Sequence, residues 1–333
     1  MKILITGAAG FIGSHLVDLL LAEGVGAKDL RLIIPKGESL NNLAKVPFEI
    51  IRGDIRDKKS VAKAMKGVDV VYHLAAKIDF DGKTYHEYGE INVDGTQNLL
   101  DACKGKKIRK FIFFSSIGVF GLPAGIGDII NWDENHPKTY TNFYGKSKWE
   151  GEKRVMKAHD KWGLPYAIIR PASVYGPREK GPTYGMYQAI KKHQFLMIGN
   201  GKNKMHYVFV GDLVKAARLA ELSRKIKGDY IIGGPSADKF IDIADSIAAS
   251  IDMKIPRFYL PKKLALVLSY LMELAGKMVG IKPPLFPSRV RTMTTTYFYN
   301  INKAKKELGY NPQIDFKKGS TVTGRWYMQN NLL

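Results

Sequence analysis

The chain is short of the features that mark several protein classes. Its 333 residues include one cysteine, Cys103, which excludes an internal disulfide and a cysteine-based metal site, and we expect no metal. No internal repeat or low-complexity segment is present. Met1 leads directly into an apolar run and leaves no room for a signal peptide, so we expect a cytoplasmic protein. Cys103 lies in a helical pattern, Asn98 to Lys104, and is expected to be a buried thiol.

Acidic residues are scarce relative to basic ones. The 52 Lys and Arg against 31 Asp and Glu give a formal net charge of +21, a balance that suits anionic partners. The basic residues are scattered, however, and the sequence has no helix-turn-helix, zinc-finger or aromatic RNA-binding signature. We therefore expect a lysine-rich solvated surface and no specific nucleic-acid partner.

Long uncharged apolar runs are also missing. The most apolar segment, Leu264 to Ile281, contains Glu273 and Lys277, which lie one helical turn apart. A membrane-spanning helix needs about 20 largely uncharged residues, so this segment is not expected to span a bilayer. Two interpretations stay open: a core helix of a second lobe, or a helix that contacts a membrane surface or lines an apolar pocket.

The N-terminal stretch MKILITGAAGFIGS is the most informative one. An apolar run, Ile3 to Ile5, precedes Gly7, Gly10 and Gly13, and a helical pattern begins at His15. Strand, glycine turn and helix start occur in the order that a dinucleotide-binding fold requires. Gly7 permits the tight turn, Gly10 lets the backbone approach a pyrophosphate, and Gly13 lets the helix pack closely on the strand. The free N–H groups at the helix start would hold the phosphates.

Short apolar runs alternate with helical or loop segments over the first 120 residues and predict a parallel, doubly wound α/β sheet. The expected strands are Leu32 to Ile34, Phe48 to Ile51, Val68 to Tyr72, Phe111 to Phe114, Tyr166 to Ile169 and Tyr230 to Ile232. Residues 126–141 are polar, contain Pro137 and are predicted to form a surface loop. We expect a nucleotide-binding domain of residues 1–175 plus about 203–235. Residues 176–202 and 236–333 would form a smaller, discontinuous substrate-binding lobe.

A Tyr-x-x-x-Lys pattern supplies candidate catalytic groups. Tyr144 and Lys148 share one helical face, and the ammonium could lower the pKa of the phenol from about 10 toward neutrality. Three other Tyr-x-x-x-Lys matches occur, but only Tyr144 follows a serine-ended strand, 28 residues after Ser116. Ligands of an open parallel sheet bind at the carboxyl ends of its strands, which favours this match.

Together these motifs resemble the extended branch of the short-chain dehydrogenase/reductases, the NAD-dependent epimerase/dehydratase family, on the side of 3β-hydroxysteroid dehydrogenases and dihydroflavonol reductases. The resemblance covers nearly the whole chain. Its landmarks are Gly53-Asp54-Ile55, His73-Leu74-Ala75-Ala76, Asn92-Val93-Asp94-Gly95-Thr96, Phe114-Ser115-Ser116, Tyr144 to Lys148, Arg170-Pro171, Val174 to Pro177, Val210 to Leu213 and Lys303 to Tyr310.

The resemblance implies a Rossmann fold and hydride transfer between a substrate carbon and a nicotinamide. Tyr144 would be the acid/base, Lys148 would orient the ribose and assist Tyr144, and Ser116 would hydrogen-bond the reacting oxygen. It also implies a homodimer through helices at Asn92–Lys104 and Tyr144–Lys161. Asp212 is expected to cap a helix. By the same resemblance, Asp54 and Ile55 would flank the adenine and Ala75 would line the cofactor channel. Further cofactor-binding candidates are Phe11, Ile12, Ala76, Pro171 and Val174.

The choice of cofactor depends on the loop after the second strand. An acidic residue there would bind the ribose 2′-hydroxyl of NAD. Pro35 or Lys36 stands at that place, and Lys36 with Ser39 could hold the 2′-phosphate of NADP. We therefore expect NADP, while Glu38 keeps NAD open.

The substrate is the least determined feature. Ile117-Gly118 stands where the dehydratase branch has an acidic pair, which argues against dehydration. Met205 stands where nucleotide-sugar enzymes of this family usually carry an arginine. We therefore expect a hydrophobic alcohol or ketone, with a nucleotide-sugar 4-epimerase and a non-catalytic NADP-sensing protein as alternatives. Candidate substrate residues are Lys77, Asn92, Met205 and His206.

Overall fold

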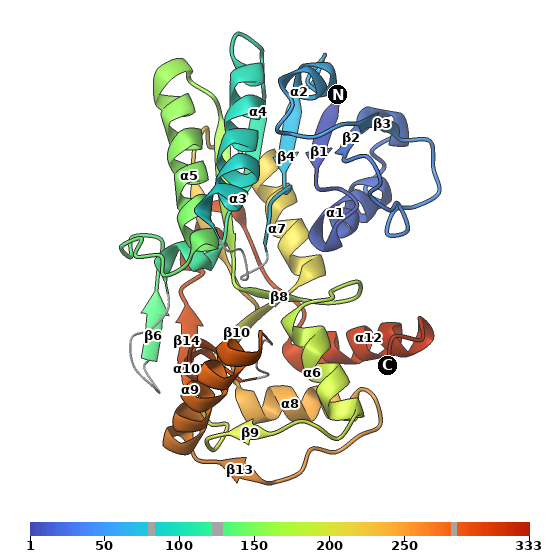
Figure 1. Ribbon diagram of the computed structural model, residues 1–333. Coiled ribbons are helices and arrows are strands. Elements are labelled where there is room, and N and C mark those ends of the chain that lie inside the picture. Colours follow the sequence, from blue (N-terminus) through green and yellow to red (C-terminus); the bar gives the residue numbers. More distant parts are fainter. Residues whose placement is uncertain (79–83, 122–128, 281–284) are drawn as a thin grey trace.

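The computed structural model describes residues 1–78, 84–121, 129–280 and 285–333. Its main element is a seven-stranded sheet of order β11-β7-β5-β4-β1-β2-β3, in which every pairing is parallel (Figure 1). The strands are β1 (Ile3–Thr6), β2 (Leu30–Ile34), β3 (Glu49–Arg52), β4 (Val70–His73), β5 (Lys110–Phe114), β7 (Tyr166–Pro171) and β11 (Asp229–Ile232). The sequence prediction of a doubly wound parallel sheet is confirmed.

Helices cover both faces of this sheet, because its central strands are apolar on both sides. On one face α1 (Phe11–Ala22), α7 (Val210–Leu222) and α11 (Asn302–Leu308) pack with residues such as Ile5, Leu32 and Ile169. On the other face α2 (Lys58–Ala64), α4 (Gly95–Cys103) and α5 (Phe143–Trp162) pack with Leu4 and Phe113, among others. Cys103 lies in this second core, where burial raises the pKa of its thiol to about 12, so it is a structural residue.

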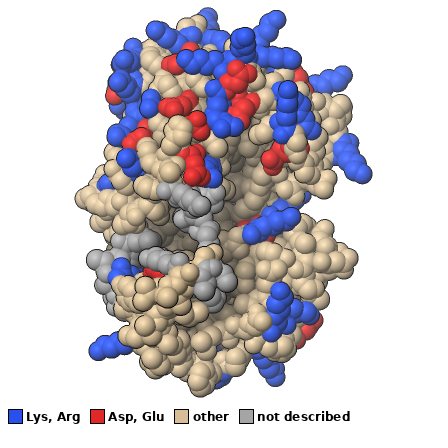
Figure 2. Space-filling view, in the orientation of Figure 1, with Lys and Arg blue, Asp and Glu red and all other residues tan. Residues whose placement is uncertain are grey.

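The strand order reverses between β1 and β4. The chain runs from β1 outward through β2 and β3, and then returns to β4 on the other side of β1. In open parallel sheets, ligands bind beyond the carboxyl ends of the strands at such a reversal. The carboxyl ends of these strands face the second lobe, and the surface is hollowed at the junction of the two parts (Figures 1 and 2).

The second lobe contains short strands and five helices of the described residues. One sheet joins β8 (Ser173–Tyr175), β10 (Lys204–Phe209) and β12 (Ala237–Lys239), and a second joins β9 (Met197–Ile198) to β13 (Tyr259–Leu260). The helices are α6 (Pro182–Lys191), α8 (Phe240–Ala249), α9 (Lys262–Val279), α10 (Pro287–Thr294) and α12 (Phe316–Gln329). Within the described ranges, no helix has the length and apolar character needed to cross a membrane.

Two expectations about the irregular segments are wrong. Residues 126–141 were expected to form a loop, but β6 (Ile129–Trp132) pairs in parallel with β14 (Thr296–Tyr299), a partner that local sequence cannot reveal. Asp212 does not cap α7; its carboxylate accepts the backbone N–H groups of Gln313 and Ile314, at 3.0 and 2.9 Å.

The lobe boundaries also need an adjustment near the C-terminus. Residues 236–333 were all expected in the small lobe. Tyr297, Ile301, Leu308 and Tyr310 instead belong to the apolar core of the large sheet. The chain therefore returns to the nucleotide-binding domain in this region before α12 packs against α8 in the small lobe. The remaining short elements are α3 (Tyr85–Tyr88), a π-helical turn (Gly89–Asp94) and 3₁₀ turns at Ala27–Asp29 and Ile117–Phe120.

Candidate active site

The glycine loop between β1 and α1 is shaped by close backbone contacts. Gly7 has φ = +69°, and a Cβ there would lie 2.8 Å from the backbone nitrogen of Ala75 beyond β4. A Cβ on Gly13 would lie 2.1 Å from the carbonyl oxygen of Gly7. The expected roles of Gly7 in the turn and Gly13 in helix packing therefore have direct steric reasons.

A chain of buried hydrogen bonds fixes this loop against β4 and α4. The Thr6 hydroxyl lies 2.8 Å from His73 Nδ1 and accepts the N–H of Ala75 at 3.0 Å. His73 Nε2 lies 2.8 Å from the Thr96 hydroxyl. Burial holds the pKa of His73 at about 3, so the ring is neutral and one nitrogen donates while the other accepts. His73 was quoted only as a family landmark, and its role as the link between β1 and α4 was missed.

The start of α1 is open to a ligand. Gly10 is its N-cap and is exposed, and no side chain caps the first N–H groups of the helix. Phe11 and Ile12 follow in the first turn and are half-buried. Uncapped N–H groups at the end of a helix dipole form an anion-binding site. These residues fit the pyrophosphate of a dinucleotide.

The remaining cofactor candidates lie along the same edge of the sheet. Ile55 is buried against Gly95, whereas Asp54 is half-buried and paired with Arg56, which lowers the pKa of its carboxyl through a hydrogen bond. Lys36 and Ser39 are exposed in the loop after β2. Three further candidates follow strand ends or lie in the adjoining segments: Ala76, Pro171 and Val174.

Ser116 and Tyr144 meet beyond the carboxyl end of β5. Ser116 caps the 3₁₀ turn Ile117–Phe120 by accepting the N–H of Gly118 at 3.0 Å, and it hydrogen-bonds the Tyr144 phenol. The first turn of α5 approaches so closely that a Cβ on Gly145 would lie 2.3 Å from the Gly118 carbonyl oxygen. Glycine at 145 thus permits the close approach that positions Tyr144.

The electrostatics of the pair differ from the sequence expectation. Lys148 is buried one turn after Tyr144, with its nitrogen 4.9 Å from the centre of the Phe113 ring. Burial lowers the pKa of Lys148 to about 7 and raises the pKa of Tyr144 to about 12. The expected lowering of the phenol pKa is therefore wrong, because burial is the largest influence on this group and it disfavours the phenolate. The opposing influence on the phenol comes from Ser116.

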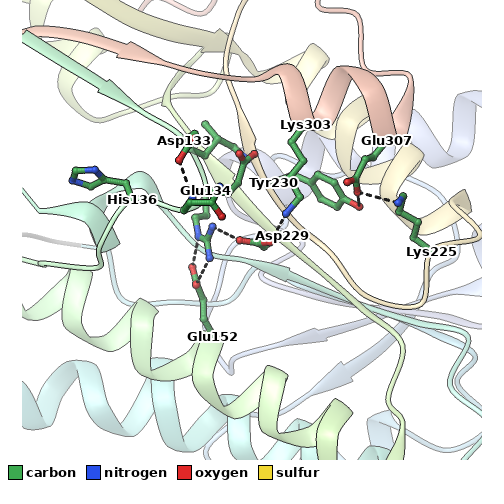
Figure 3. A network of polar contacts seen from close by, with 12 residues as sticks. Asp133, Glu134, His136, Glu152, Lys225, Asp229, Tyr230, Lys303 and Glu307 are labelled. Atoms are coloured by element: carbon green, nitrogen blue, oxygen red, sulfur yellow. Dashed lines mark hydrogen bonds and ion pairs between the residues drawn. The ribbon is translucent and has the colours of Figure 1, made fainter.

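A buried ionic network supports α5 behind the site (Figure 3). Glu152, one turn beyond Lys148, receives two hydrogen bonds from Arg170 on β7, at 2.9 and 2.6 Å. Arg170 also donates to Asp229 on β11, which pairs with Lys303 on α11 at 2.6 Å. The Ser115 hydroxyl donates to Glu152 as well. The segment that follows β5 and the helix that carries Lys148 are therefore held together by a common carboxylate.

The segment after β6 closes over this network. The buried Glu134 carboxylate accepts the backbone N–H of Ile231 at 2.9 Å, and Lys138 donates to the Glu134 carbonyl at 2.6 Å. The polar residues for which a loop was predicted thus include side chains, Glu134 and Lys138, that hydrogen-bond backbone groups near the edge of the sheet.

Three of the four candidate substrate residues serve the fold. The Asn92 amide bonds both backbone groups of Lys77 and the Ser147 hydroxyl, and is fully occupied. Met205 packs in the small-lobe core. His206 is buried, with one ring nitrogen 3.0 Å from the Gly234 carbonyl and the other accepting the N–H of Tyr299. These contacts give each of the three a structural role that the sequence did not reveal, and their assignment to substrate stays a prediction.

The fourth candidate, Lys77, pairs with Glu87 at 3.3 Å. It follows β4 beside the glycine loop, and its role stays a prediction.

Comparison with known proteins agrees with this geometry. Residues 3–233 match the model of the NAD dependent epimerase/dehydratase family. The chain is 30% identical to 3beta-hydroxysteroid-dehydrogenase/decarboxylase isoform 1 of Arabidopsis thaliana, over 95% of this chain and 77% of that protein. It spans 60% of the length of isoform 2.

Other relatives carry a different activity. The chain is 29% identical to N-acetyl-alpha-D-glucosaminyl-diphospho-ditrans,octacis-undecaprenol 4-epimerase of Escherichia coli O157:H7, over 91% of this chain and 88% of that protein. UDP-glucuronic acid 4-epimerase from Bacillus cereus in complex with NAD superimposes with a TM-score of 0.78 at 25% identity, covering 99% of each chain. With the glycine loop and the buried Tyr144 and Lys148 in place, this chain belongs to the NAD dependent epimerase/dehydratase family, whose members are enzymes.

Proposed function

We propose that the chain is an NAD(P)-dependent oxidoreductase that interconverts a secondary alcohol and a ketone on a hydrophobic substrate. The observation that carries this proposal is the grouping of Ser116, Tyr144 and Lys148 on the edge of the sheet where the uncapped start of α1 lies. A helix start suited to the phosphates of a dinucleotide and a group suited to proton transfer on the same edge of the sheet support this proposal.

The chain's own residues would move and hold the proton. When bound, the nicotinamide supplies a hydride donor or acceptor. Tyr144 would give its phenolic proton to the ketone oxygen during reduction, or take the alcohol proton during oxidation. Ser116 would hydrogen-bond that oxygen, and the Lys148 ammonium would stabilise the phenolate after the proton has left. With a pKa of about 12, the Tyr144 phenol is protonated at neutral pH and can serve as the proton donor to a ketone oxygen.

Two observations support a hydrophobic substrate. The stretch in which a nucleotide-sugar enzyme would need an arginine supplies none: Met205 and His206 are buried, and Lys202 and Lys204 point to solvent. The relatives named above as acting on a steroid and on an undecaprenol-linked sugar have substrates with a large lipid part in common. We infer that a lipid-borne hydroxyl or ketone occupies the site.

A nucleotide-sugar or lipid-linked sugar 4-epimerase is the second candidate. The same tyrosine and cofactor would serve two opposite hydride transfers at one carbon, so the site geometry suits both reactions. The likeness to the Bacillus cereus and Escherichia coli 4-epimerases favours it. The two candidates differ in whether the cofactor leaves the protein.

For the cofactor, we propose that NADP binds at least as well as NAD. Lys36 is exposed in the loop after β2, and Arg52 at the end of β3 donates to the carbonyl oxygens of Pro35 and Glu38, at 3.3 and 3.0 Å. Arg52 thus brings a second cation to the place where a 2′-phosphate would lie, a residue that the sequence analysis missed. Lys36→Ala should weaken NADP binding several-fold more than NAD binding in a fluorescence titration, and equal weakening would contradict the 2′-phosphate role.

The first experiment is to release and identify any nucleotide held by the purified protein. The protein is then titrated with NADPH and tested for net NAD(P)H turnover on sterol-like and prenyl ketones. Oxidoreductase function predicts a dissociable cofactor and net turnover. Stoichiometric retained NAD with sugar epimerisation and no net turnover would transfer the assignment to the 4-epimerase.

Tyr144→Phe provides the matched test of mechanism. Loss of the proton donor should reduce kcat by at least about 10²-fold. The cofactor Kd should change little, since the phosphates bind at α1. Full activity of this variant would remove the mechanism, and nucleotide binding without turnover by wild type on any ketone or sugar would favour the NADP-sensing alternative.

The α4 and α5 helices are also proposed as the homodimer interface. This rests on the family resemblance and is tested by light scattering of the purified protein.

A further inference from the structure

Helix α9 presents an apolar face to solvent. Leu271, Leu274 and Met278 are 58%, 61% and 81% exposed. They continue a stripe on one helical face, in which every residue has another member of the stripe three or four positions away. The stripe consists of Leu264, Val267, Leu268, Leu271, Leu274 and Met278. We call it the α9 stripe.

This helix is already anchored through its opposite face. Ala265 and Ser269 are fully buried, and Ala265 packs with Val290 of α10 and Ile198 of β9. The small residues therefore provide the contact with the protein, and the large apolar residues of the α9 stripe point away from it. A core helix would bury its large apolar residues and expose its small ones. The sequence alone could not tell which face of this helix is buried.

The segments that flank the α9 stripe carry more basic than acidic residues. Residues 254–294 contain eight Lys or Arg and one acidic residue, Glu273. Lys263 and Arg257 are exposed near the start of the helix, and Arg291 of α10 donates to the Tyr270 hydroxyl at 3.1 Å. The preceding segment adds Phe258, 69% exposed. In Figure 2 the surface in the region of α9 is nearly uncharged, whereas the nucleotide-binding domain is densely charged.

The charge around the α9 stripe distinguishes between two possible binding partners, a second copy of the chain and a lipid membrane. A second copy bound through the same face would bring two strongly positive segments together, which is unfavourable. An anionic bilayer offers apolar acyl chains for the stripe and negative head groups for the surrounding Lys and Arg. The length of α9, 18 residues with charges at its ends, suits a helix that lies in the plane of the interface.

We propose that α9 binds the surface of an anionic lipid membrane, with the α9 stripe inserted among the acyl chains. The described basic residues of the flanking segments would lie at the head groups: Lys254, Arg257, Lys262, Lys263, Arg289 and Arg291. This goes beyond the proposed function and does not depend on it, because none of these residues belongs to the catalytic group or the glycine loop. The enzyme would then reach substrates at the membrane surface.

The test is co-sedimentation of the full chain with vesicles. Wild-type protein should bind vesicles of phosphatidylcholine mixed with phosphatidylglycerol, and should bind pure phosphatidylcholine much more weakly. The double variant Leu271→Gln/Leu274→Gln should reduce binding to the mixed vesicles by about tenfold or more. Since both side chains are exposed, the variant should keep its fold, which circular dichroism checks.

Two further variants separate the apolar from the ionic contribution. Leu222→Gln/Ile226→Gln removes equally exposed apolar side chains, 56% and 63%, from the nucleotide-binding domain and should leave vesicle binding unchanged. Lys263→Glu should weaken binding to the mixed vesicles only. No binding of wild type to anionic vesicles, or equal binding by the Leu271/Leu274 variant, would overturn the proposal. Loss of a wild-type dimer in that variant would assign the α9 stripe to a second copy instead.

Discussion

At the scale of single residues, burial decides the chemistry of the site. Lys148 and Tyr144 lie one turn apart, yet each pKa moves in the direction that favours the neutral form. Glu152, one turn further, pulls the pKa of Lys148 upward but does not overcome its loss of solvent. With a pKa of about 7, Lys148 is about half protonated near neutral pH, and its charged form is the one that would stabilise a Tyr144 phenolate.

The low pKa of Lys148 predicts a pH-dependent stability. In the folded protein this pKa is about 7, below the ordinary lysine value of 10.5, so the unfolded chain binds more protons between these values. Stability therefore rises with pH across that window, by roughly 1.4 kcal/mol per unit of pKa shift at most. Lys148→Met lacks this penalty and should be more stable than wild type at pH 7, by a few kcal/mol. Urea unfolding at pH 7 to 10 should show the difference shrinking as pH rises; a constant difference would contradict it.

At the scale of elements, the site depends on how closely α5 approaches the turn after β5. The contact between Gly145 and the Gly118 carbonyl leaves no room for a methyl group. This approach brings the Tyr144 phenol to Ser116, so a backbone contact sets a side-chain geometry.

Gly145→Ala should consequently damage both stability and turnover. The Cβ would overlap a backbone oxygen that cannot rotate away, and overpacking of this kind costs about 1–3 kcal/mol. Gly185→Ala is the matched control: Gly185 lies within α6, no heavy atom lies within 4 Å of its ideal Cβ, and the change should stabilise the helix by up to about 1 kcal/mol. Thermal unfolding and kcat measure both. If Gly145→Ala behaved like the control, the close approach would have no functional importance.

Comparison of sequence and structure shows which elements can be predicted locally. All seven strands of the main sheet were predicted, because a strand buried on both faces is an apolar run between polar turns. The glycine loop and the Tyr144–Lys148 spacing could also be recognised, because each consists of residues that are close together in the sequence. The pairing of β6 with β14 depends on a distant partner, and the burial of Met205, His206 and Asn92 depends on tertiary packing, so neither could be deduced.

At the scale of the whole molecule, one ionic network joins segments from four parts of the chain. Arg170 lies between Glu152 on α5 and Asp229 on β11, and Lys303 brings the returning C-terminal helix to the same carboxylate (Figure 3). Arg170 and Glu152 are 2% and 0% exposed. The position of α5, and hence of the site, is therefore linked to the C-terminal part of the chain.

Replacing one charged partner of this network should lower the free energy of unfolding more than replacing both Arg170 and Glu152. Arg170→Met leaves the Glu152 carboxylate buried without its main partner and should cost about 3–5 kcal/mol in urea unfolding. The double variant Glu152→Met/Arg170→Met removes both charges and should recover part of that loss. Arg257→Met breaks an exposed pair with Asp245 and should change stability little. Additive costs for Glu152→Met and Arg170→Met would show that the two residues do not act as a pair.

The contact between Glu134 and Ile231 has a consequence for the behaviour of the protein in concentrated solution. β11 is an edge strand, and an unpaired N–H on such a strand invites a strand from another molecule. The Glu134 carboxylate occupies that N–H, and the opposite edge strand, β3, carries the charged Glu49 and Arg52. Both ends of the sheet are thus protected against intermolecular strand addition. Resistance to aggregation in this protein consequently depends in part on a carboxylate from a segment outside the main sheet.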